Sequence, residues 1–152
     1  MTKLSNFRVD PKALREGEWQ PLGEEFGTIE VLTRGLTDKY EDARSARQRL
    51  AAKAYGGDAE KLKVAVRKRI NTECLVEFCL MDVRGVDDDD GSPLSIEKFG
   101  QMLVSGEYPD VLQACFQAAQ RVGKQTAEDL EDAVGNSSPL SATDSSGDDT
   151  ES

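Results

Sequence analysis

Apolar residues recur at every fourth position between residues 58 and 83, and this run constrains the fold more than any other feature of the sequence. The residues on this repeat are Leu62, Val66, Ile70, Cys74 and Phe78. A four-residue spacing places them on one face of a helix. Residues 74–81 are apolar on almost every side, which is typical of a buried helix. The sequence therefore predicts a helix over 58–83 that ends near Gly85, with its C-terminal half in the hydrophobic core.

Helical periodicity and end signals predict four more helices, and one segment predicts strands. The expected helices cover residues 38–55, 58–83, 96–105, 109–122 and 126–134. Ser95 is the expected N-cap of the third, and Thr37 that of the first. Residues 18–22 and 28–34 alternate and flank turn residues, which predicts a β-hairpin. The chain is thus expected to be mainly α, with four to five helices and a small N-terminal β-hairpin.

The acidity of the chain is concentrated at its C-terminus. Of the 29 acidic residues, eight lie between residues 128 and 152, where there is no base, so residues 1–127 carry 21 acids against 19 bases. From residue 136 onward, too few apolar groups are present to offset the entropy of an ordered chain. We expect one mostly helical domain over 1–135 and a disordered acidic tail over 136–152. Whether that tail is an interaction segment or a dispensable terminus stays open.

The absence of histidine excludes several kinds of chemistry. A Ser-His-Asp triad, a Cys-His dyad and His-ligated metal sites are all ruled out. No glycine-rich phosphate-binding motif occurs. The three cysteines, Cys74, Cys79 and Cys115, lie in apolar contexts without a Cys-x-x-Cys spacing and are interpreted as core thiols. We therefore expect a protein that is not an enzyme, with no catalytic residue, metal ligand or cofactor.

An acidic turn over residues 86–97 invites comparison with an EF-hand calcium loop. With Gly91 at the sixth position, two aspartates and Glu97 fall on ligand positions. However, Val86 stands at the first position, where a chelating carboxylate belongs. We favour a turn that caps the following helix, and keep a calcium-binding helix-loop-helix module as a weaker alternative.

A basic region covers residues 34–69, with eleven Lys or Arg against five acids. Nucleic-acid binding would use such a region, but no aromatic residues interleave with the cations for base stacking, and the whole chain is acidic. Solvated helix faces are the favoured interpretation, and an intramolecular contact with the acidic tail is an alternative. No apolar run is long enough to span a bilayer, and the first residues lack the apolar stretch of a signal peptide. These features predict a cytoplasmic protein.

Several short motifs together resemble a known family. They are FRVDP at 7–11, GEW at 17–19, VRGVDDDDGSPLSIE at 83–97, and the segment from 103 through Tyr108-Pro109 into the helix at 114–119. Their order and spacing, over roughly residues 5–125, resemble the tail assembly chaperones of long-tailed, siphovirus-like bacteriophages and prophages.

The resemblance implies a function in phage assembly. Such chaperones act in the host cytoplasm, bind the hydrophobic tape-measure protein, keep it soluble while tail-tube subunits polymerise, and are absent from the mature virion. A longer frameshifted form in many of them recruits the major tail tube protein. That protein, and a second copy of this chain in a homo-oligomer, are the further candidate partners. The candidate partner-binding residues are Leu50, Tyr55, Phe99 and Leu103. A neck or tail-completion protein retained in the particle is the main alternative.

Overall fold

The computed structural model describes residues 2–124, of which Pro11–Gly123 form one compact unit. The segment up to Asp10 belongs to a second unit and contains a short 3₁₀-helix, Leu4–Phe7. The helix expected over 126–134 and the tail expected over 136–152 lie outside the described residues.

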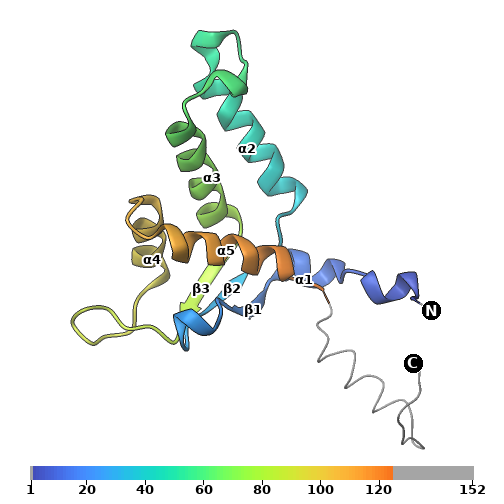
Figure 1. Ribbon diagram of the computed structural model, residues 1–152, viewed down its shortest axis with the longest axis vertical. Helices are drawn as coiled ribbons and strands as arrows, with labels where there is room; N and C mark the ends of the chain where they lie inside the picture. The colour runs from blue at the N-terminus through green and yellow to red at the C-terminus, as the bar shows by residue number, and fades with distance from the viewer. Residues whose placement is uncertain (1, 125–152) are drawn as a thin grey trace, which may run out of the picture. The chain divides into compact units, whose positions relative to one another are not determined.

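Within Pro11–Gly123, the fold consists of five α-helices and a small antiparallel sheet (Figure 1). The helices are α1 (Pro11–Glu16), α2 (Asp38–Ala51), α3 (Val64–Phe78), α4 (Ile96–Val104) and α5 (Pro109–Arg121). The strands are β1 (Glu18–Pro21), β2 (Glu30–Thr33) and β3 (Leu80–Arg84), in the spatial order β1-β2-β3. This confirms the mainly α fold and the predicted hairpin, which β1 and β2 form.

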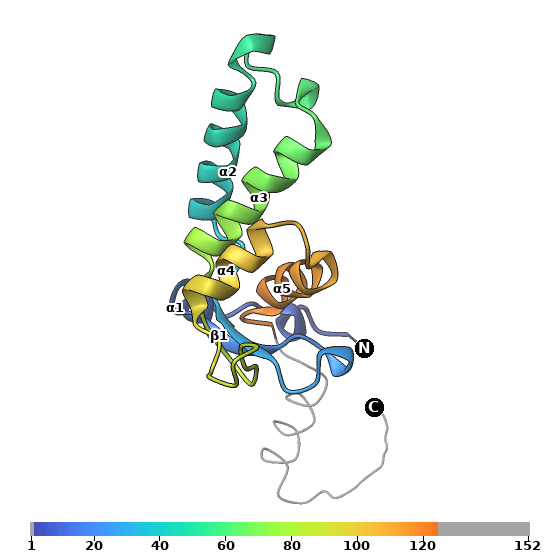
Figure 2. The same cartoon turned by 90° about the vertical axis from the view of Figure 1, so that its left-hand side faces the viewer.

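The helices fall into two groups around the sheet. Helix α5 packs on β1 and β2, and α4 contacts both α3 and β3. Helices α2 and α3 pack along each other and project away from the sheet as a helical hairpin (Figures 1 and 2). Two 3₁₀ turns, Lys53–Tyr55 and Ala59–Lys61, connect them. We call this projection, residues 38–78, the arm.

The predicted helix over 58–83 is wrong at both ends. It begins only at Val64, because Asp58 accepts a hydrogen bond from the backbone of Glu60 and caps a separate 3₁₀ turn. It ends at Phe78, and the chain then enters β3, which pairs with β2. A short apolar run is compatible with either a buried helix or a buried strand, so periodicity alone could not separate the two. The exposed edge of β2 decides the outcome, since pairing satisfies its backbone groups.

One side chain joins all three strands. The guanidinium of Arg84 on β3 donates to the carboxylate of Glu30 on β2 at 2.7 Å. The same group lies over the ring of Trp19 on β1, 4.0 Å from the ring centroid. The pairing also shifts register between Leu32 and Thr33, and this irregularity bends the sheet locally.

The helix ends agree with part of the predicted capping. The Ser95 hydroxyl accepts a hydrogen bond from the Lys98 backbone N–H at 3.2 Å, which confirms it as the N-cap of α4. Thr37 occupies the N-cap position of α2 but makes no side-chain cap bond. Pro109 begins α5, where its missing N–H costs nothing. Local signals therefore place α2, α4 and α5 to within a few residues.

Candidate interaction surface

The end of the arm exposes large apolar side chains. We define the arm tip as residues 49–68, which lie farthest from the sheet in both views (Figures 1 and 2). Leu50 is 71 % exposed, Tyr55 48 %, Val64 56 % and Val66 39 %. Single exposed apolar residues are common, but four within one short segment are typical of an interaction site.

The arm tip also carries a concentrated positive charge. It contains six cations against two acids, Asp58 and Glu60. The cations are Arg49, Lys53, Lys61, Lys63, Arg67 and Lys68. Among residues 2–124, none of these six forms an ion pair. The first turn of α3 contains no acid, so its helix dipole adds to the positive potential there.

Nearer the sheet, three of the four cations of the arm form ion pairs, and Lys39 forms none within residues 2–124. Arg44 pairs with Glu41, and Arg69 pairs with Glu73 at 3.4 Å. Arg47 bridges the two helices: it donates to Glu77 at 2.8 Å and lies 5.4 Å from the ring centroid of Phe78. Six of the seven arm cations that form no ion pair within residues 2–124 therefore lie at the tip.

Buried contacts hold the arm in place. Ala52 is fully buried and Leu62 is 7 % exposed, so small apolar contacts continue into the tip. Farther down, the side-chain amide of Gln48 donates to the side-chain amide oxygen (Oδ1) of Asn71 at 2.8 Å and joins α2 to α3. The exposed apolar residues thus sit on a packed scaffold.

The structure separates the four predicted partner-binding residues into two pairs. Leu50 and Tyr55 are exposed at the arm tip. Phe99 and Leu103 are 4 % and 2 % exposed and belong to the core, because α4 is enclosed by α3, α5 and β3. The interpretation of Phe99 and Leu103 as residues left over at the surface is therefore wrong.

Sequence reasoning missed two exposed residues, Val64 and Val66. Val66 belonged to the predicted core face of the 58–83 helix, yet it is 39 % exposed. Asp58 caps the separate 3₁₀ turn Ala59–Lys61, so α3 begins only at Val64. Val64 and Val66 therefore lie in the first turn of α3 and not in the middle of a long buried helix.

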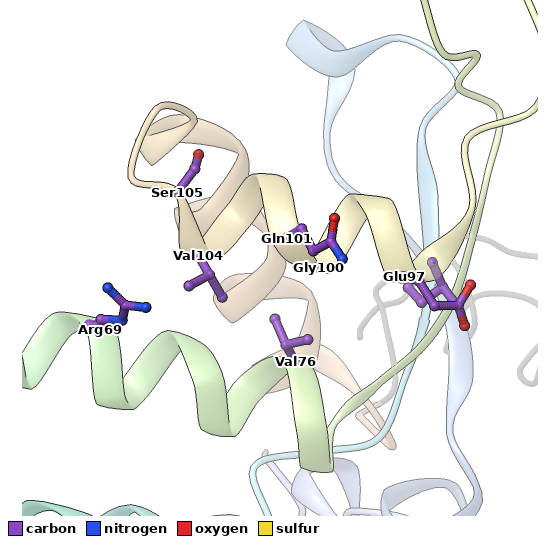
Figure 3. Close-up of a pocket in the computed structure, with 8 residues that line it drawn as sticks. Arg69, Val76, Glu97, Gly100, Gln101, Val104 and Ser105 are labelled. Carbon is purple, nitrogen blue, oxygen red and sulfur yellow. The ribbon is translucent and has the colours of Figure 1, made fainter.

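A shallow groove of about 420 Å³ lies between α3 and α4 (Figure 3). Val76 of α3 points toward Gly100 of α4, where a Cβ would come within 2.8 Å of the Val76 Cγ1 atom. The remaining lining residues are Arg69, Ile96, Glu97, Gln101, Val104 and Ser105. Polar and apolar side chains line the groove together, and its one cation, Arg69, already pairs with Glu73.

The acidic turn uses its carboxylates within the fold. Asp88 accepts from the Lys98 ammonium, which holds the pKa of Asp88 below its usual value. Asp90 accepts from the backbone and hydroxyl of Ser92, and these bonds likewise lower its pKa. Among residues 2–124, no group of three or more Asp, Glu or Cys side chains is arranged to hold a metal ion.

The three cysteines are free and buried, as predicted for core thiols. Burial raises the pKa of Cys79 and of Cys115 to about 12. A protonated thiol is a poor nucleophile, so these groups are structural. The phenol of Tyr40 is also buried, and burial raises its pKa to about 12.

These raised pKa values predict a loss of stability at alkaline pH. In the unfolded chain a thiol ionises from about pH 9, whereas buried Cys115 keeps its proton to about pH 12. The contribution of Cys115 to the free energy of unfolding should therefore be constant below pH 9 and fall as the pH rises from 9 toward 12. The free energy of unfolding, measured by urea unfolding between pH 9 and 12, should fall less steeply with pH in Cys115→Ala than in the unmodified protein. The expected difference is up to about 1.4 kcal/mol per pH unit. Identical slopes in the two proteins would contradict the buried, protonated thiol.

The chain matches a known family of prophage proteins. The family model of the YdaY prophage protein matches residues 36–136. The chain belongs to this prophage protein family. The match to the YdaY family includes the whole arm and begins after the β1–β2 hairpin. No curated protein and no solved structure matches the chain significantly. In the described part of the chain, no helix combines the length and apolarity needed to cross a bilayer.

Proposed function

We propose that this YdaY-family protein is a non-enzymatic tail assembly chaperone. It binds the tape-measure protein in the host cytoplasm, keeps that protein soluble while the tail tube polymerises, and leaves before the virion is complete. The observation that carries the proposal is the exposure of Leu50, Tyr55, Val64 and Val66 at the arm tip. Membership of a prophage family agrees with it.

The arm suits the task of shielding an apolar helical protein. Exposed aliphatic and aromatic side chains offer contacts to apolar helix faces, which would otherwise aggregate. The cations around them keep the tip hydrated and soluble when no partner is bound. A packed scaffold limits the side-chain and backbone ordering that binding would require.

Co-expression with the tape-measure protein from the same prophage tests the proposal. We expect a soluble complex in a pull-down on this chain, and an insoluble tape-measure protein when it is expressed alone. The double variant Leu50→Ser with Tyr55→Ser should reduce recovery of the complex, because it removes exposed apolar contacts without disturbing the core.

A matched control replaces two other exposed apolar residues. Leu4 and Phe7 are 88 % and 68 % exposed, so Leu4→Ser with Phe7→Ser makes a comparable change outside the arm. Recovery of the complex should stay near the unmodified level. A soluble tape-measure protein that does not associate with the chain would refute the proposal.

The main competing function is a structural neck or tail-completion protein. Mass spectrometry of purified particles distinguishes the two, since a chaperone should be missing from the mature virion. Stoichiometric recovery of this chain in purified particles would refute the chaperone proposal and support the structural function.

A further inference from the structure

We infer that the arm tip binds an acidic amphipathic helix, and that the tape-measure segment it takes has this composition. The identity of the partner rests on the proposed function, whereas the chemistry of the surface rests on the arm alone. The inference specifies which segments of a long helical partner would be selected.

The first argument is charge complementarity. Arg49, Lys53, Lys61, Lys63, Arg67 and Lys68 form no ion pair within residues 2–124, while three of the four arm cations nearer the sheet are paired, Lys39 being the exception. A partner with glutamates or aspartates would meet these cations, and a basic partner would be repelled. The two acids of the tip are too few to reverse this preference.

The second argument is the apolar content of the same segment. Leu50 and Tyr55 alternate with Arg49 and Lys53, and Val64 and Val66 lie between Lys63 and Arg67. An amphipathic helix presents one apolar face with polar residues along its sides, so it can satisfy both kinds of contact at once. A uniformly acidic, unfolded segment would leave the aliphatic groups without partners.

The third argument is size. Helices α2 and α3 contain 14 and 15 residues, and a 14-residue helix is about 21 Å long. A partner helix of four or five turns therefore has a length comparable with that of the arm.

Nucleic acid fits the surface less well. Three of the four exposed apolar residues are aliphatic, and Tyr55 is the one aromatic among them, so stacking platforms for bases are scarce. Phosphate contacts would use the cations but leave Leu50, Val64 and Val66 without a role.

Fluorescence anisotropy of labelled model peptides on the full chain tests the inference. The probe is a helical peptide of about 18 residues with leucines at helical spacing and glutamates elsewhere. Two companion peptides replace either every glutamate with lysine or every leucine with serine. We expect the Leu/Glu peptide to bind at least about tenfold more tightly than both companions, and its affinity to weaken with added salt.

Charge reversal locates the site. Lys63→Glu with Lys68→Glu should weaken binding of the Leu/Glu peptide by roughly tenfold. The matched control, Arg15→Glu with Lys39→Glu, makes the same change in net charge at exposed cations outside the tip, and should change affinity by less than about twofold. Circular dichroism of each variant shows whether its helical fold is retained.

Three outcomes would overturn the inference about the surface. Equal binding of the glutamate and lysine peptides, equal losses in the two charge variants, or tighter binding of a duplex DNA of similar length would do so. If the peptide preference fails while the tape-measure protein is still recovered, the proposed function stands without this selectivity. If the peptide preference holds but the tape-measure protein does not associate, the partner is wrong and the surface chemistry is retained.

Discussion

Gly85→Ala is expected to lower the free energy of unfolding by about 2–5 kcal/mol. Gly85 follows β3 with φ +78°, a conformation that side-chain-bearing residues adopt at a cost. An added Cβ would overlap the carbonyl oxygen of Thr28 and approach its carbonyl carbon to 2.8 Å. Both groups are backbone, so neither can rotate away. The Thr28 hydroxyl also donates to the Gly85 carbonyl at 2.8 Å, and this bond would be strained as the two segments separate.

Gly91→Ala is the matched control for this prediction. Gly91 has a similar φ of +86°, but an added Cβ would meet no atom within 4 Å. It should cost only the conformational term, about 1 kcal/mol. Urea unfolding of both variants separates the two effects. Equal destabilisation would show that the close approach of Gly85 to Thr28 does not contribute.

Leu103→Ala is expected to destabilise the protein by about 2–5 kcal/mol. Leu103 is 2 % exposed on α4, within the core that α3, α4, α5 and the sheet enclose. Truncation removes apolar contacts and leaves a cavity that the rigid neighbours fill only partly. Thermal or urea unfolding measures the loss, and the variant should still bind the partner at temperatures where it is folded.

Leu50→Ala provides the comparison at the arm tip. Leu50 is 71 % exposed, so its truncation should change stability by no more than about 0.5 kcal/mol. Its effect should appear instead in partner recovery. The contrary pattern, a stable Leu103→Ala and an unstable Leu50→Ala, would reverse the assignment of core and surface made from the structure.

Part of the candidate site could be anticipated from the residues alone. Leu50 lies near the end of α2 and Tyr55 in the turn that follows, and both are predicted as apolar positions left over after the core is filled. Phe99 and Leu103 had the same apolar character, and local sequence could not say that α4 would be covered on several sides. Side-chain type therefore identified apolar candidates, while burial by distant elements decided which of them remain accessible.

Local sequence signals were sufficient to predict several elements of the fold. The Ser95 cap, Pro109 at the start of α5, and the alternating hairpin segments act over a few residues, and each one is present in the structure. The apolar contexts of the cysteines likewise led to their burial. Only the tertiary structure decided that residues 80–84 form a strand, because the exposed edge of β2 lies about fifty residues away in the chain. It also decided that Arg47 of α2 pairs with Glu77 of α3, since the packing of the two helices sets the distance between these charges.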